Sequence, residues 1–183
     1  MNLSQKDFSS KQEWQNFGVD LFTERSTKLQ GIRNNLQLPH QGLLYYPACG
    51  RDNSPDSAFQ GWEIYYMDAV DSGIKTSCEG KFIKGDLMFP PFEITNVKFD
   101  VALLISPGNH FDQYTPAYIQ QVTKYVRIGG YIICDDYHQT ASDIRHYLQY
   151  ELKEVAIGET ESEFTAFIKL VGDEGLEPPT LSV

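Results

Sequence analysis

The apolar run Asp100-Val-Ala-Leu-Leu-Ile-Ser106, closed by Pro107-Gly108, is the strongest strand signal in the sequence. Four other short apolar runs share its form, because each ends at a proline, a glycine or an acidic residue: Leu43–Tyr46, Glu63–Met67, Lys81–Lys84 and Tyr131–Cys134. Stretches with turn or helix signals separate them. Short apolar runs joined by helical connectors are typical of parallel strands that are buried on both faces. The pattern predicts an α/β fold with a doubly wound, mostly parallel sheet and helices on both faces.

The connector after this run carries the signals of a helix. Thr115 suits the N-cap and Pro116 the first helical position. An apolar stripe follows at helical spacing, at Ile119, Val122 and Val126. Gly129-Gly130 is predicted to end this helix before the fifth strand.

The C-terminal part predicts one more helix and two strands. Thr140 is the expected cap of a helix that carries Ile144, Tyr147 and Leu148. Residues 152–157 and 164–171 then form two strands joined by a short polar turn. A turn of that length permits only an antiparallel pair. The sheet is therefore predicted to have seven strands, with an antiparallel last strand.

Residues 1–38 are predicted to form an N-terminal helical extension. Ser10 and Glu13 make a capping box, and apolar residues follow at helical spacing, at Trp14, Phe17, Leu21 and Phe22. A second helical stretch is predicted through Leu29, Ile32 and Leu36. The sequence leaves open whether this extension is a lid on the sheet or part of a substrate pocket. Residues 172–183 are predicted to be a disordered tail.

Composition limits the class of protein. The chain has 183 residues, enough for one core, and a net charge of −10, which disfavours extended binding to a phosphate backbone. Three scattered cysteines suit neither a disulfide framework nor a zinc site. The N-terminus does not resemble a signal peptide, and no apolar run approaches the length of a membrane span. We expect a cytoplasmic protein that makes no membrane contact.

Polar residues stand at the carboxyl end of each predicted parallel strand. They are the segments 48–52, 106–110 and 135–138 together with Asp68 and Asp86. Open parallel sheets bind ligands at these ends, so the set predicts a shared site.

This order of features resembles the class I S-adenosylmethionine-dependent methyltransferases over about residues 40–171, and the resemblance implies a methyltransferase-like Rossmann domain at 39–171. In that family a glycine-containing loop after the first strand approaches the cofactor, and the loop Pro47, Ala48, Cys49 and Gly50 is similar to it. The loop holds one glycine where the family pattern has three, although the thiol methyltransferases use a Pro-x-Cys-Gly version. Arg127-Ile-Gly-Gly resembles the family's Lys-Pro-Gly-Gly turn.

The resemblance also implies roles for two aspartates. Asp68 takes the place of the acidic residue that binds the ribose hydroxyls, and Asp86 that of the residue beside the adenine ring. A carboxylate can bind a vicinal diol through paired hydrogen bonds. Each aspartate could instead serve as a turn or capping residue, and this alternative stays open.

The segment after the fourth strand lies where the family places cofactor-binding and catalytic groups. The resemblance assigns Ser106 to the cofactor and Asn109 and His110 to catalysis, with His110 as a general base. The alternative is a polar surface loop.

A second segment, Asp135-Asp136-Tyr137, is similar to the metal-binding Asp-Asp-Tyr of magnesium-dependent sugar O-methyltransferases. Those enzymes need another acidic ligand where this chain has Ser106. We therefore predict no metal, and the sequence leaves open the alternative that Asp135 and Asp136 hold one.

The sequence leaves two main functions open. The first is an S-adenosylmethionine-dependent methyltransferase acting on a small molecule, and the second is a non-catalytic binding or interaction protein with the same fold. A nicotinamide-dependent oxidoreductase is disfavoured because Gly50 stands alone where that class has Gly-x-Gly-x-x-Gly. The sequence does not indicate the oligomeric state.

Overall fold

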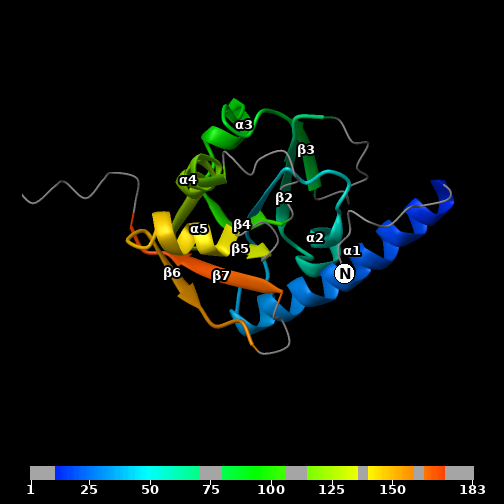
Figure 1. The fold of residues 1–183 in the computed structure, drawn as a ribbon, viewed down its shortest axis with the longest axis horizontal. Coiled ribbons are helices and arrows are strands. Elements are labelled where there is room, and N and C mark those ends of the chain that lie inside the picture. Colours follow the sequence, from blue (N-terminus) through cyan, green and yellow to red (C-terminus); the bar gives the residue numbers. More distant parts are fainter. Residues whose placement is uncertain (1–10, 71–79, 106–114, 136–139, 159–162, 172–183) are drawn as a thin grey trace, which may run out of the picture.

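In a computed structural model, the described residues are 11–70, 80–105, 115–135, 140–158 and 163–171, of which 11–20 and 115 are described as backbone only. The predicted tail 172–183 and residues 1–10 of the predicted extension lie outside them. The described chain alternates helices and strands around one sheet (Figure 1). In chain order the elements are α1 (Lys11–Asn35), β1 (Leu43–Pro47), α2 (Ser54–Ala58), β2 (Glu63–Asp68), β3 (Gly80–Lys84), α3 (Phe92–Thr95), β4 (Phe99–Leu104), α4 (Thr115–Tyr125), β5 (Val126–Asp135), α5 (Thr140–Tyr147), β6 (Leu152–Val155) and β7 (Phe164–Lys169).

The described strands form a seven-stranded sheet in the order β3-β2-β1-β4-β5-β7-β6. Strands β1 to β5 are parallel, whereas β7 runs antiparallel to both β5 and β6. The predicted α/β class and antiparallel last strand are confirmed. Chain order reverses direction between β1 and β4, so the carboxyl ends of these two strands flank the switch point at which open sheets bind ligands.

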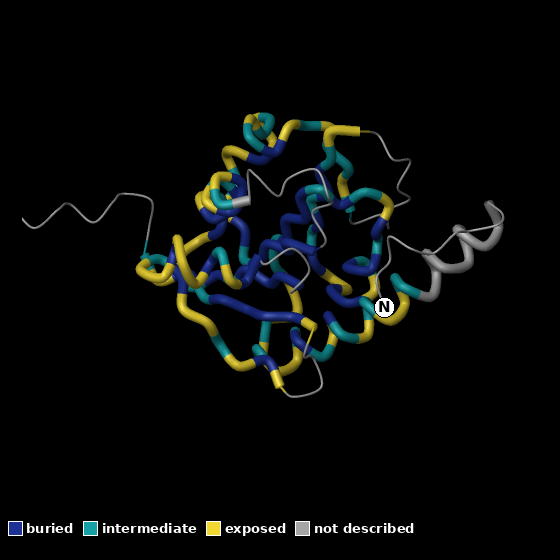
Figure 2. The backbone as a smooth tube through the Cα atoms, viewed as in Figure 1, coloured by how far each residue is buried: buried dark blue, intermediate teal, exposed yellow. Residues whose placement is uncertain are grey.

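Two apolar cores lie on opposite faces of the sheet. Successive residues of a strand point to opposite faces, and along β1 the side chains of Leu44 and Tyr46 enter one core while that of Tyr45 enters the other. Helices α3, α4 and α5 cover the face with Tyr45, and helices α1 and α2 cover the other. The central strands are consequently buried along most of their length (Figure 2).

The predicted second helical stretch is helical at Leu29 and Ile32, but it continues the first without a break in one helix that ends at Asn35, before Leu36. Leu29 and Ile32 are fully buried against β1 and β4. Their helical spacing continues that of Leu21 and Phe22, and no proline or glycine pair interrupts the helix.

The prediction that Gly129-Gly130 ends a helix was also wrong. Helix α4 ends at Tyr125, and both glycines lie inside β5. Phe99 pairs with Val126 and Val101 with Tyr131, so one residue of β4 faces four residues of β5 in a bulge. A Cβ atom on Gly130 would lie 2.8 Å from the Asp100 carbonyl oxygen, which explains why glycine is needed there.

A buried lysine joins β7 to the end of α4. Lys169 is 1% exposed, and its Nζ donates hydrogen bonds to the carbonyl oxygens of Thr123 (2.8 Å) and Val126 (3.1 Å). A cation is favourable at a helix C-terminus, where carbonyl groups lack helical partners.

Replacing Lys169 with methionine is therefore expected to lower the free energy of unfolding by about 2 kcal/mol, because two buried carbonyl groups lose a charged donor while the apolar stem is kept. Urea unfolding measures the change. Lys153→Met is the matched control, since Lys153 is an exposed lysine on neighbouring β6 and should change stability little. Equal effects of the two substitutions would contradict this role for Lys169.

None of the described helices has the length and hydropathy that crossing a bilayer requires.

Candidate cofactor site

The loop after β1 leaves the sheet through two residues with left-handed backbone. Ala48 has φ 52° and Gly50 has φ 56°, a region that favours glycine and is uncommon for alanine. Between them, the Cys49 amide donates to the Met67 carbonyl oxygen on β2 (3.2 Å). The loop is thus tied to the end of the neighbouring strand.

Asp68, the last residue of β2, fastens the same loop through its side chain. One carboxylate oxygen accepts the Gly50 amide (2.9 Å) and the other accepts the Val70 amide (3.1 Å). Pairing of Pro47 with Met67 brings the two strand ends side by side. The expectation that the lone-glycine bend and the carboxylate after the second strand lie together is confirmed. The turn role that the sequence left open for Asp68 is also present.

Asp86 lies at the adjoining strand end. Asp68 pairs with Lys84 of β3, and the Gly85 amide donates to the Asp68 carbonyl oxygen (3.0 Å). The Asp86 carboxylate accepts the Met88 amide (2.8 Å), which is the turn geometry that the sequence allowed. Its role beside an adenine ring stays a prediction.

The described residues leave the space in front of Gly50 open. A Cβ atom placed on this residue would meet none of their heavy atoms within 4 Å. A ligand could therefore approach the backbone of the loop closely, and a larger residue would take up that space.

Cys49 is not suited to act as a nucleophile. Burial, with a smaller effect from the charge of Asp68, raises the pKa of its thiol to about 12. The thiol stays protonated at neutral pH, whereas the reactive form of cysteine is the thiolate.

Tyr118 of α4 is a buried polar residue that sequence reasoning missed. It is buried, and burial raises the pKa of its phenol well above the ordinary value. The negative charges of Asp135 and Asp68 raise this pKa further. Tyr118 lies next to Ile119 in α4, and both belong to the apolar core. A sequence pattern therefore does not distinguish Tyr118 from an apolar core residue.

A second missed feature is a buried ion pair that holds the loop to α1. The Arg25 guanidinium pairs with the Asp52 carboxylate, and the side chains are 13% and 5% exposed. The same carboxylate accepts the Tyr46 hydroxyl (2.8 Å) and the Ser54 amide (2.8 Å). Burial, and then the charge of Asp52, raises the pKa of Tyr46 well above its ordinary value, so the phenol stays protonated as a donor. Arg25 and Asp52 are 27 residues apart, and no sequence pattern joins them.

Several predicted residues lie outside the described part of the chain: Ser106, Asn109, His110, Asp136 and His138. Asp135 is described as the buried last residue of β5. Within the described ranges, no three His, Cys, Asp or Glu side chains form a group that could hold a metal ion.

No protein-family model matches this sequence, and no curated protein matches it. Solved structures do match in three dimensions. The N-methyltransferase NodS from Bradyrhizobium japonicum WM9 has a TM-score of 0.60 at 14% identity, with 81% of this chain and 97% of that chain covered. NodS has also been solved in complex with S-adenosyl-L-homocysteine.

Two further structures are similar. A TehB-like SAM-dependent methyltransferase from Corynebacterium glutamicum has a TM-score of 0.56 at 13% identity, covering 77% of this chain and 87% of its own. The MycE methyltransferase from the mycinamycin biosynthetic pathway, in complex with Mg and SAH, has a TM-score of 0.55 at 15% identity, covering 100% of this chain and 63% of its own. With the strand order and the antiparallel β7, these matches show that the chain has the Rossmann-like fold of the class I SAM-dependent methyltransferases.

Proposed function

We propose that this protein is an S-adenosylmethionine-dependent methyltransferase that acts on a small-molecule acceptor. The observation that carries the proposal is the hydrogen bond from the Gly50 amide to the Asp68 carboxylate (2.9 Å), at the carboxyl ends of β1 and β2 and beside the switch point of a methyltransferase-type sheet. It places a close-approach backbone loop and an acidic group together at the edge where such sheets bind nucleosides.

The residues at this edge fit the nucleoside part of the cofactor. A carboxylate oxygen has two lone pairs. Each oxygen of Asp68 accepts one backbone amide in the structure and so retains capacity for a ribose hydroxyl. Gly50 leaves open space beside the loop, and Asp86 stands at the next strand end.

The cofactor, when bound, supplies a methyl group already activated on a sulfonium. The protein then has to align donor and acceptor and keep the acceptor in the reactive protonation state. Within this proposal Ser106 contributes to cofactor binding, Asn109 positions the acceptor and His110 takes its proton. The acceptor is small and is not an extended nucleic acid, because the chain carries a net charge of −10.

One observation favours the second candidate, a non-catalytic binding or interaction protein. Both carboxylate oxygens of Asp68 already accept backbone amides, and Gly50 is the only glycine in the loop after β1. A loop held in this way could keep the fold and the cofactor site after catalysis had been lost.

Calorimetric titration with S-adenosylhomocysteine and S-adenosylmethionine tests the proposal. We expect both to bind at one site per chain. A panel of small acceptors with a labelled methyl donor should then yield a methylated product. Binding without turnover would favour the non-catalytic protein, and absence of binding would contradict both candidates.

A further inference from the structure

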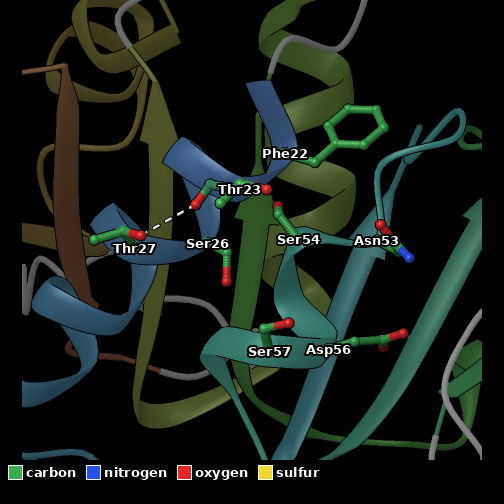
Figure 3. A pocket seen from close by; sticks show the side chains of 8 residues that line it. All are labelled: Phe22, Thr23, Ser26, Thr27, Asn53, Ser54, Asp56 and Ser57. Atoms are coloured by element: carbon green, nitrogen blue, oxygen red, sulfur yellow. Dashed lines mark hydrogen bonds between the residues drawn. The ribbon is translucent and has the colours of Figure 1, made fainter. Parts of the chain in front are cut away.

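A cavity lies between α1 and α2 (Figure 3). Its volume is about 310 Å³, the lower end of the range for small-molecule pockets, which suits a single ring. It is separate from the Asp68 and Asp86 carboxylates, neither of which lines it.

Hydroxyl groups dominate the described walls of this cavity. Helix α1 contributes Thr23, Ser26 and Thr27, and helix α2 contributes Ser54 and Ser57. A hydroxyl group can donate one hydrogen bond and accept two. The wall can therefore match a ligand that itself presents several hydroxyl groups.

Two other polar side chains and one aromatic ring also line the cavity. Asn53 offers an amide, and Asp56 offers a carboxylate that accepts the Tyr66 hydroxyl (2.7 Å). The Phe22 ring supplies an apolar surface at one end. No lysine or arginine is among the described lining residues, so nothing there favours a phosphate or carboxylate ligand.

The Ser54 hydroxyl is an independent sign of a missing partner. Ser54 is 3% exposed, and its Oγ is buried without a hydrogen-bond partner among the described residues. Figure 3 shows this side chain pointing from α2 toward α1. An unsatisfied buried hydroxyl is costly, and serine can turn its Oγ between staggered rotamers to meet a ligand in the cavity.

We propose that the cavity between α1 and α2 binds a neutral, polyhydroxylated molecule of the size of one sugar ring. Its hydroxyl groups pair with Ser54 and with the hydroxyl, amide and carboxylate groups around it, and its C–H face packs on Phe22. The proposal does not depend on methyl transfer. Asn53, which follows the loop after β1, is one of the lining residues.

Saturation-transfer NMR titrations of the full chain with methyl α-D-glucopyranoside, methyl β-D-galactopyranoside and myo-inositol test this proposal. We expect at least one to bind, and Ser54→Ala to weaken it about fivefold, the worth of one hydrogen bond. Ser142→Ala, on the exposed side of α5, is the matched control and should leave binding unchanged. Thr23→Val repeats the test from the α1 wall. Thr23 is exposed and valine keeps its shape, so this variant should fold even if Ser54→Ala does not.

Three results would overturn the proposal. The first is that none of the three compounds binds. The second is that binding does not respond to Ser54→Ala or Thr23→Val, which would place the ligand elsewhere. Putrescine and glucose 6-phosphate are the charged probes, and binding of either at this cavity in place of the neutral compounds would also overturn it. Titration of the same samples with S-adenosylhomocysteine keeps this outcome separate from that of the proposed methyltransferase function.

Discussion

Replacing Arg25 with glutamine is expected to lower the free energy of unfolding by about 3–5 kcal/mol, the usual cost of removing one partner from a buried ion pair. The Asp52 carboxylate is buried in the structure, and among the described residues it would keep the Tyr46 hydroxyl and the Ser54 amide as donors. Urea unfolding followed by circular dichroism gives the change.

An exposed pair provides the control for this prediction. The Arg145 Nε and Glu154 Oε2 atoms are 2.8 Å apart, and both side chains are about half exposed. Arg145→Gln should cost less than 1 kcal/mol, because water screens such pairs. Adding Asp52→Asn to Arg25→Gln removes the uncompensated charge and should recover part of the stability. A small loss on Arg25→Gln alone would show that the pair does not hold α1 to the loop.

Replacing Asp68 with alanine is expected to weaken the binding of S-adenosylhomocysteine by more than tenfold. Two effects act together. The ribose loses its carboxylate, with charged hydrogen bonds worth about 1.5–3 kcal/mol each. The loop also loses the bond that fixes the Gly50 amide. Calorimetric titration measures the dissociation constant.

Glu63→Ala is the matched control, because Glu63 is the acidic residue at the other end of the same strand, where it contacts Lys81 and Tyr65. It should leave the dissociation constant unchanged. Thermal melting of both variants shows whether the fold is kept. If Asp68→Ala binds as tightly as the unsubstituted protein, Asp68 has no place in the site.

The sheet could be predicted from the sequence because its signal is local. Each strand is a short apolar run, and a buried parallel strand needs little more than that. The site loop and Asp68 could be paired for the same reason, since the carboxyl ends of neighbouring strands meet at one edge. The closing hairpin followed from the length of its turn.

The features that could not be predicted depend on distant contacts. Gly129-Gly130 has the composition of a helix end, and only the bulge against Asp100 shows why glycine stands inside a strand. Lys169 falls in an alternating strand, and its partners are 46 and 43 residues away. The hydroxyl groups of the cavity between α1 and α2 come from two helices that β1 separates in the sequence, so they form no motif.

The way α1 is seated also has a consequence for handling the protein. Leu29 and Ile32 pack into the apolar core on one face of the sheet. Arg25 of the same helix neutralises the buried Asp52 carboxylate. A truncated protein that starts after Asn35 would expose the apolar surface that these residues cover and would leave the Asp52 carboxylate without its arginine. Such fragments should be insoluble when expressed. N-terminal truncations that are meant to stay soluble should therefore keep Leu21 and all residues after it.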